Sequence, residues 1–498
     1  MPASPSTARA LNDRLALRLL QQEGPLTAGQ LKQLTGLSRP TVADLVDRLT
    51  ASGLITVVGE SGEQRRGPNA RLYGIVADRA HLAALDVRTE GVFVLVSDLV
   101  GRVLAEASVP IGPDAGTGPA VEQAVAAVES AVKEADAMGA PLREGVPGWG
   151  RLHTVGIGAP GLIDPATGDL RDSAGLPAWH RSLAATLQDR LPGARVTVEN
   201  ETNLAALAEQ REGAARDRDT FVLLWLGHGV GAAVVLDGRL RRGASGGTGE
   251  IGFLPVPGTA TLPSGTDCAG GFHSLTGAAA VVSLAAECGL PAPAAPDGPG
   301  AAEVVRAAVA QAEKAGQALP GLVTGPTKGS GGAMPVAGPV VGPGRVAPDA
   351  GPVTGSRRAV PVARPGDVRA ERPAGADPEA ATRPGAVTTA ASGEGRAGAG
   401  PDSAARFLRV LADRIAVGAA SVVAVLDPGC VVLGGEVGQA GGAMLAGLVE
   451  ERLRRMSPLV TEVRASSLGG TAVLRGALLT ARERAQEELF APPERPGG

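Results

Sequence analysis

The sequence predicts an α/β protein, and three observations support this fold class. Apolar residues recur at helical spacing in the first 50 residues and again in later segments such as residues 119–138. Short runs rich in valine and leucine alternate with these segments, as in residues 221–236. The length of 498 residues exceeds what one hydrophobic core usually supports, so we expect two or three domains.

Composition argues against a disulfide-rich, secreted or membrane-spanning protein. The formal net charge is −4, which neither requires nor excludes a nucleic-acid partner, because a local basic patch decides that. Cys268, Cys288 and Cys430 lie far apart and predict neither a disulfide framework nor a CxxC metal site. The N-terminus has no signal-peptide stretch, and no 18 apolar residues run uninterrupted. We therefore expect a cytoplasmic protein without a membrane partner.

Residues 1–76 predict three helices followed by a β-hairpin. Leucines at helical spacing indicate a first helix that ends at a Gly-Pro pair. Thr27 and Ser38 are suitable N-caps for a second and a third helix, and Pro40 suits the first turn of the third. Residues 54–76 are typical of two strands around a polar, glycine-rich turn. This order of elements is that of a winged helix-turn-helix.

The third helix is the candidate recognition helix, whose first residues would face base edges in the major groove. We expect Arg39 to reach guanine, and Ser38 or Thr41 to hold phosphates. The hairpin adds three cations suited to phosphates or to the minor groove, namely Arg65, Arg66 and Arg71. Residues 1–76 carry nine basic and six acidic side chains, so they form a basic unit in an acidic chain. The alternative is a small interaction domain with a solvated charged face.

From residue 80 onward strands alternate with helices, up to a helix near 301–318. Residues 321–401 have a different composition. In 321–400, Gly, Ala and Pro supply 44 of 80 positions and no aromatic residue occurs. Such a segment cannot bury enough apolar surface to offset the entropy lost on ordering. We therefore predict a disordered insertion at 321–401, with order resuming at 402.

Four motifs occur in a fixed order and resemble those of the ROK family (repressors, open reading frames and kinases). They are TVGIGAPGLID at 154–164, VENETNLAALAE at 198–209, LGHGVGAAVVLDGRLRRGASGGTGEIG at 226–252 and VVAVLDPGCVVLGGEVG at 422–438. The helix-turn-helix ahead of them resembles the repressor branch, of xylose and N-acetylglucosamine type. The resemblance implies a two-lobed, actin-like ATPase (sugar-kinase-like) domain, with lobe 1 at 80–200, lobe 2 beginning at 201–320, and the rest of lobe 2 with a closing helix at 402–498.

The resemblance also implies a sugar site in the cleft between the two lobes. Glycines let the backbone approach a ligand closely, and amide and carboxylate groups hydrogen-bond to hydroxyls. On this basis we expect sugar to be bound by Gly158, Gly161, Asn200, Glu201, Glu250 and His273. Taken singly, each has an ordinary alternative: a helix-capping Asn, a solvated Glu or a turn Gly.

The residues that would handle ATP differ from those of ROK kinases. The first phosphate loop of those kinases has the pattern Asp-x-Gly-Gly-Thr. The corresponding residues of this chain are Asp86, Val87, Arg88, Thr89 and Glu90. Both glycines are absent, and the Glu90 carboxylate would repel ATP. The catalytic-base position holds Glu201 instead of Asp, which displaces the carboxylate by one methylene. We therefore expect no catalytic residue, no cofactor and no kinase activity.

Other positions of the family pattern are also altered. ROK proteins often have His after GEIG and a cysteine cluster that binds structural zinc. Here Phe253 follows GEIG and only Cys268 remains of the cluster, so we expect no metal. Gly175 stands where an Asn sugar contact often lies, and His228 stands where the second phosphate loop usually has Thr. We interpret the remaining glycines of that loop, and LGG at 433–435, as retained fold geometry.

These patterns favour a sugar-responsive transcriptional regulator, with repression favoured on family grounds. Its expected partners are operator DNA, a sugar or sugar-derivative effector, and further copies of the chain in a homodimer or homotetramer. One alternative is an active ROK sugar kinase, phosphorylating hexoses with ATP, that carries a DNA-binding domain. Another is a DNA-binding protein whose cleft has lost its ligand and serves only dimerisation.

Overall fold

The protein is described by a computed structural model. The chain divides into one unit of residues 1–322 and 398–498 and a second unit of residues 323–397. All described residues belong to the first unit and comprise 5–61, 70–112, 114–138, 151–171, 176–265, 269–316 and 401–490. The predicted insertion therefore lies outside the described residues, apart from its last residue, Pro401, which begins a helix.

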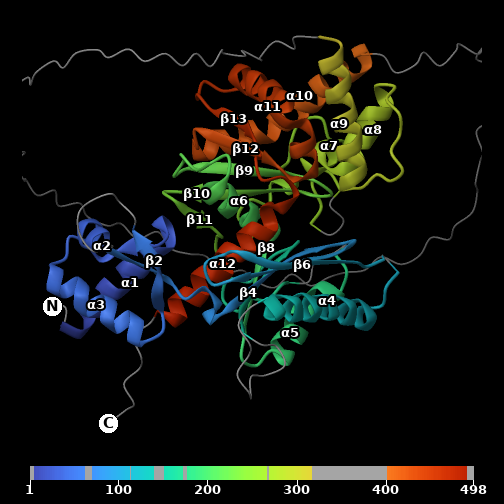
Figure 1. Ribbon diagram of the computed structural model, residues 1–498. Coiled ribbons are helices and arrows are strands. Elements are labelled where there is room, and N and C mark those ends of the chain that lie inside the picture. Colours follow the sequence, from blue (N-terminus) through green and yellow to red (C-terminus); the bar gives the residue numbers. More distant parts are fainter. Residues whose placement is uncertain are drawn as a thin grey trace, which may run out of the picture. The chain divides into compact units, whose positions relative to one another are not determined.

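The N-terminal part contains the predicted helices and hairpin, together with one further short strand (Figure 1). Its elements are α1 (Pro5–Glu23), β1 (Leu26–Thr27), α2 (Ala28–Thr35), α3 (Arg39–Ala51), β2 (Ile55–Ser61) and β3 (Ala70–Ile75). β1 pairs with β3, so the sheet has the order β1-β3-β2. The extra strand ties the start of α2 to the hairpin and confirms a winged helix-turn-helix.

Local capping residues fix where the second and third helices begin. Thr27 caps α2 in a capping box, in which Gln30 N–H donates to Thr27 Oγ1 (3.2 Å) and Thr27 N–H donates to Gln30 Oε1 (2.8 Å). α2 ends at Gly36, whose φ of +70° is a left-handed conformation that favours glycine. Ser38 caps α3, as predicted. The turn before the recognition helix is therefore encoded locally.

Lobe 1 is built on a five-stranded mixed sheet in the order β6-β5-β4-β7-β8. Its strands are β4 (His81–Arg88), β5 (Gly91–Asp98), β6 (Val103–Pro110), β7 (Leu152–Ala159) and β8 (Arg195–Asn200). The first three strands are antiparallel, and β4, β7 and β8 are parallel. Two helices, α4 (Thr117–Met138) and α5 (Trp179–Arg190), pack on one face and enclose a core of small aliphatic side chains.

Lobe 2 repeats this topology. Its sheet has the order β11-β10-β9-β12-β13, again with three antiparallel strands followed by parallel ones. The strands are β9 (Phe221–Leu226), β10 (Val230–Leu236), β11 (Arg239–Arg241), β12 (Cys430–Gly434) and β13 (Glu462–Ala465). The same order of strands in two successive sheets is what a two-lobed actin-like domain requires, and it follows from two βββαβαβ-like halves of the chain.

The helices of lobe 2 come from both sides of the undescribed segment. They are α7 (His273–Thr276), α8 (Ala278–Glu287), α9 (Gly298–Lys314), α10 (Pro401–Leu426) and α11 (Gly435–Met456). The last three pack against one another and form one apolar core with Phe272 and Phe407. Because α9 and α10 belong to the same core, the insertion interrupts the sequence of lobe 2 and not its fold.

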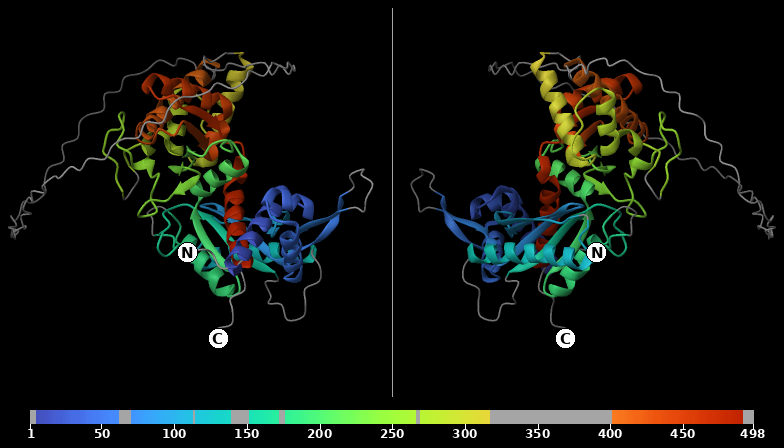
Figure 2. Two further views of the ribbon diagram at one scale, coloured as in Figure 1. Left: turned by 90° about the vertical axis from the view of Figure 1, so that its left-hand side faces the viewer. Right: turned by 90° about the vertical axis from the view of Figure 1, so that its right-hand side faces the viewer.

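Two helices lie between the sheets, namely α6 (Glu201–Glu212) and α12 (Ala472–Leu489). α12 packs along α6 and across β4 and β7, on the lobe 1 face opposite α4 and α5 (Figures 1 and 2). The closing helix expected within residues 402–498 is α12, and it packs on α6 and on the lobe 1 sheet. Gly156 and Gly158 permit this packing, because a Cβ at either residue would collide with α12.

Candidate functional site

The start of the recognition helix presents polar side chains in a fixed arrangement. Ser38 Oγ accepts a hydrogen bond from Thr41 N–H (3.3 Å) and lies 2.7 Å from Thr41 Oγ1. Arg39 is the first residue of α3, and its side chain is exposed. The two hydroxyls are thus engaged with each other at the helix N-terminus, and Arg39 extends beyond them into solvent.

Other arginines of this domain have different surroundings. Arg48 donates to Asp13 (2.7 Å) and also pairs with Asp44, so it joins α3 to α1. Arg71 on β3 is exposed and lies opposite Glu60 on β2. Arg65 and Arg66 lie outside the described residues. Of the candidate wing contacts, the structure therefore places Arg71 alone.

Asn200 links the GAPG loop to the N-terminus of α6. Its Oδ1 accepts from the N–H groups of Thr202 (2.9 Å) and Asn203 (3.2 Å), which makes it the N-cap. Its Nδ2 donates to the carbonyl of Gly161 (3.0 Å) and approaches Glu201 Oε2 (3.4 Å). Gly161 has a φ of +107° that favours glycine. In this state the amide of Asn200 is fully used in positioning the loop and the helix.

Glu201 is the first residue of α6 and is half-buried. Burial raises the pKa of its carboxyl group to about 8, and the carboxylates of Asp86, Glu436 and Glu250 act in the same direction. Burial likewise raises the pKa of Glu250, which lies on the loop before Ile251. The structure therefore brings Glu201 and Glu250, two of the predicted sugar ligands, into one acidic group.

Two other predicted sugar residues have different surroundings. His273 begins α7 beside Gly252, and burial, followed by the nearby His228, lowers its pKa. Gly158 is enclosed by Val473 of α12 and Leu204 of α6, which a Cβ at this position would strike. Its lack of a side chain is therefore required by helix packing.

The first phosphate-loop position is filled by an ion pair. Arg88 donates through Nε (2.9 Å) and Nη2 (2.6 Å) to one oxygen of Asp86, which is buried. Arg88 Nη2 also donates to the carbonyl of Gly470 (3.2 Å), and its guanidinium stacks 4.6 Å from the Phe93 ring centre. Burial raises the pKa of Asp86, while Arg88 lowers it. A side chain held at four points thus stands where ROK kinases have a glycine.

Glu436 is a cleft residue that the sequence did not single out. It lies in the first turn of α11, directly after the LGG motif, and it acts on the pKa of Glu201. Burial raises the pKa of Glu436 itself, and Arg88 opposes this effect. Gly227 makes room for it, because a Cβ at Gly227 would collide with Glu436 Oε2. The sequence signal for Glu436 is its acidic side chain directly after the two glycines of the LGG motif.

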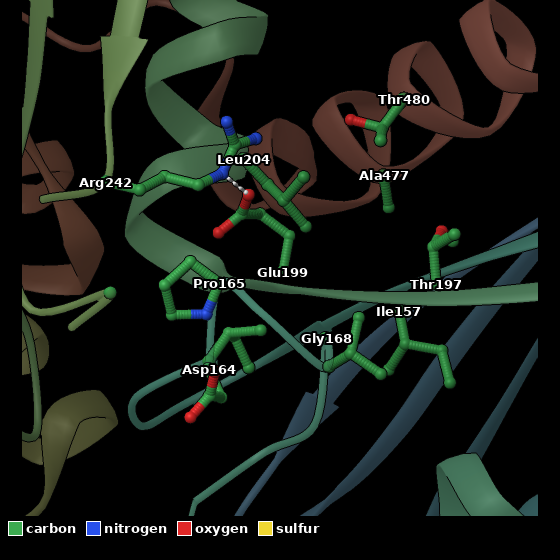
Figure 3. A pocket seen from close by; sticks show the side chains of 14 residues that line it. Ile157, Asp164, Pro165, Gly168, Thr197, Glu199, Leu204, Arg242, Ala477 and Thr480 are labelled. Atoms are coloured by element: carbon green, nitrogen blue, oxygen red, sulfur yellow. Dashed lines mark hydrogen bonds and ion pairs between the residues drawn. The ribbon is translucent and has the colours of Figure 1, made fainter. Parts of the chain in front are cut away.

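A cavity of about 320 Å³ is lined by residues of β7, β8, α6 and α12 and of the loop after β11 (Figure 3). Arg242 Nε donates to Glu199 Oε2 (2.6 Å) and closes one wall. Glu199 Oε1 accepts from Asn200 N–H (3.0 Å) and from Asn203 Nδ2 (2.9 Å). None of the six predicted sugar residues lines this cavity. The Glu199–Arg242 pair, which the sequence did not predict, instead joins the loop after β11 to the base of α6.

The raised pKa of Glu201 predicts a pH-dependent stability. Its folded pKa of about 8 exceeds the ordinary value of 4.5, so ionisation favours the unfolded chain and stability falls as pH rises between these values. The free energy of unfolding of the wild type should fall between pH 5 and pH 8. In Glu201→Gln we expect this fall to be smaller by about 2 kcal/mol. Urea unfolding at both pH values measures this. An unchanged pH dependence, equal to that of the exposed-site control Glu313→Gln, would contradict the burial of an ionising Glu201.

The chain is similar in sequence to known protein families. A sequence model of the ROK family matches residues 122–320 and 387–484, and one of the MarR family matches residues 11–67. The xylose repressor of Caldicellulosiruptor bescii is 26% identical over 252 residues, which are 50% of this chain and 59% of that protein. The N-acetylglucosamine repressor of Escherichia coli O6:H1 is 28% identical over 252 residues, 50% of this chain and 58% of that protein. The chain thus spans less than two thirds of the length of these relatives.

A solved structure has the same architecture. A ROK family transcriptional regulator, a homologue of the E. coli Mlc protein, superposes with a TM-score of 0.62 at 17% identity, covering 97% of this chain and 98% of that one. At this identity the likeness establishes the fold. It confirms an N-terminal winged helix-turn-helix ahead of a two-lobed, actin-like domain.

Proposed function

Because the chain belongs to the ROK family, we propose that it is a sugar-responsive, DNA-binding transcriptional regulator, and specifically a repressor. Its proposed partners are operator DNA, a sugar or sugar derivative, and further copies of the chain in a homodimer or homotetramer. A sugar can change DNA binding only through different affinities for two states of the protein. The proposed place of action is the cytoplasm. Among the described helices, none has the length and apolar character needed to span a membrane.

One observation carries this proposal: a single helix contacts both the cleft and the DNA-binding domain. The first part of α12 packs on α6, whose first residues are Glu201 and Thr202. Its last part, with Ala481 and Ala485, shares a core with α1, together with Phe490, which follows the helix. We propose that ligand binding moves α6 and that α12 moves with it, because the two helices pack together. Because α12 also packs on α1, its movement would displace the helix-turn-helix.

Polar contacts at this junction give a test of the coupling. Gln486 Nε2 donates to Gln21 Oε1 (2.9 Å) and to the carbonyl of Leu99 (3.3 Å), while Gln21 Nε2 donates to Val100 O (3.2 Å). We expect Gln486→Ala to leave operator binding and sugar binding in place and to reduce the effect of sugar on operator affinity by about fivefold. Fluorescence anisotropy with labelled operator measures both quantities. An effect of sugar equal to that in the exposed-site control Arg484→Ala would argue against this route.

The proposed regulator does not catalyse phosphoryl transfer. Such transfer needs groups that cradle phosphate and neutralise its charge. The only described cation at the first phosphate-loop position, Arg88, is committed to Asp86, and Glu90 and Glu436 add negative charge nearby. The alternative of an active kinase is tested by ATP-dependent phosphorylation of a panel of hexoses. Robust turnover would overturn the non-catalytic part of the proposal.

The sugar-binding residues remain a proposal: Gly158, Gly161, Asn200, Glu201, Glu250 and His273. Of these, Glu250 is the best position to mutate, because no hydrogen bond described for the fold uses its side chain. We expect Glu250→Ala to weaken sugar binding by about tenfold, through the loss of a charge-assisted hydrogen bond, and to leave operator affinity unchanged. Thermal shift across a sugar library measures the first effect, since a ligand that binds the folded state raises the melting temperature.

Two outcomes of that experiment would count against the proposal. An unchanged sugar response in Glu250→Ala would remove Glu250 from the site. A library in which no sugar raises the melting temperature of the unmodified protein would favour the second alternative, in which the cleft serves only dimerisation. The DNA-binding part of the proposal is independent of both results.

A further inference from the structure

An open groove of about 720 Å³ runs between α12 and the strands β5 and β6 of lobe 1. On its floor, Phe93 and Val103 are exposed over 38% and 46% of their surface, although both side chains are apolar. Leu474 and Leu478 of α12 form the facing wall. This α12 groove therefore offers a partly uncovered apolar surface, and a ligand that covers it gains free energy from the burial.

Arg482 of α12 also lines the groove and lies beside the turn between β5 and β6. Its Nη1 donates to the carbonyl of Val100 (3.4 Å), and no ion pair or second hydrogen bond of its guanidinium is found among the described residues. A Cβ at Gly101 would come within 2.8 Å of this Nη1, so the glycine of the turn leaves room for the guanidinium. Burial lowers the pKa of Arg482, and Glu212 and Glu483 oppose this effect without being bonded to it. Arg482 is thus a partly desolvated cation with unused donors.

The other charged residues of the groove are engaged elsewhere or lie away from this end. Arg88 and Arg475 are each bonded to a carboxylate. Glu106 is exposed and belongs to the middle of β6, whereas Arg482 lies at the turn before that strand. Within the described lining, an anion that enters the groove therefore meets one cation without a counter-ion, and that cation stands at the end of an apolar floor.

We propose that the α12 groove is a second ligand site, which binds a small amphipathic carboxylate separately from the sugar cleft. Arg482 holds the carboxylate through its unused donors, because the planar guanidinium matches two carboxylate oxygens. The aliphatic or aromatic body of the ligand covers Phe93 and Val103. The described lining includes none of the six residues proposed to bind sugar, so the two ligands occupy different places.

The test compares each carboxylate with its neutral amide on the full chain, in the absence of sugar and DNA. Octanoate and octanamide represent an aliphatic body, and 4-phenylbutyrate and 4-phenylbutanamide represent an aromatic one. Ligand-observed NMR titration gives the four Kd values. We expect at least one carboxylate to bind with a Kd below about 1 mM, and its amide to bind at least about tenfold more weakly. Equal affinities within both pairs, or no binding of either carboxylate, would overturn the inference and leave the proposed function untouched.

Three variants assign the binding to the groove. In Arg482→Gln, the affinity for the carboxylate should fall about tenfold, to that of the amide, while the affinity for the amide stays the same. The matched control Arg484→Gln, at an exposed cation of the same helix, should keep the wild-type affinities. Val103→Glu adds a carboxylate at an exposed position of the floor and should also weaken carboxylate binding about tenfold, without disturbing the core. Unchanged carboxylate binding in Val103→Glu, or in a folded Arg482→Gln, would place the ligand elsewhere and overturn the inference.

Discussion

Replacing Arg39 by alanine is expected to abolish specific operator binding at working protein concentrations. Arg39 is the exposed first residue of α3, and the cap formed by Ser38 and Thr41 fixes the direction in which it leaves the helix. A bidentate contact from arginine to guanine contributes about 1–3 kcal/mol of discrimination. The proposed dimer would lose this twice, because both of its recognition helices carry the change. Anisotropy titration with operator and with unrelated DNA measures the loss.

The same variant should leave the sugar site intact. Arg39 has no described contact with lobe 1 or lobe 2, so the thermal shift caused by sugar should match that of the wild type. The control is Arg18→Ala, which removes an exposed cation from α1 of the same domain. It should weaken binding to all DNA slightly, because it changes only the general charge. Equal loss of operator binding and sugar binding in Arg39→Ala would contradict two separable sites.

Replacing Glu209 by alanine is expected to lower the free energy of unfolding more than any other substitution proposed here. Glu209 is fully buried and accepts from the N–H groups of Ala214 (2.6 Å), Ser467 (3.1 Å) and Leu468 (3.2 Å). It also accepts from the hydroxyl of Ser466 (2.6 Å). Its removal leaves several buried donors without a partner, each costing about 1–3 kcal/mol. We expect a loss of about 4 kcal/mol or more in the free energy of unfolding.

A neighbouring glutamate on the same helix provides the control for this experiment. Glu212 pairs with Arg475 (3.1 Å) at the surface, so Glu212→Ala should change stability by less than about 0.5 kcal/mol. Urea unfolding monitored by circular dichroism compares the two variants. Because Glu209 ties the end of α6 to the loop before α12, a mild effect of its loss would mean that these helices are joined mainly by apolar packing.

Sequence reasoning predicted the fold well where local signals agree with tertiary packing. Thr27 and Ser38 were recognised as caps because a short polar side chain before an apolar-periodic run has few other roles. The two-lobed α/β domain followed from alternating segments and from the resemblance to ROK proteins. The pairing of β1 with β3 could not be predicted, because two residues carry no periodic pattern and the pairing depends on the turn after α1.

The candidate site was harder to predict, because its electrostatics depend on residues distant in sequence. Glu201 and Glu250 were named from motifs, and they share one acidic group. Asn200 was named for its capacity to bind hydroxyls, and in the structure its amide caps α6 and holds Gly161. Glu436 was passed over, because the hollow that receives it is formed by Gly227 and Gly298, each more than 100 residues away. A sequence motif predicts the local backbone conformation, whereas the charged groups around that backbone depend on the whole fold.

Sugar-responsive DNA binding is tested by the affinity for operator with and without sugar, measured with the full chain. A DNA fragment selected from the genome by binding to the purified protein serves as the operator, and anisotropy gives its Kd at increasing concentrations of the sugar that raises the melting temperature. We expect saturating sugar to change this Kd by about 5–150-fold, and operator to change the sugar affinity by the same factor. An operator affinity that is identical at every sugar concentration would contradict a sugar-responsive regulator.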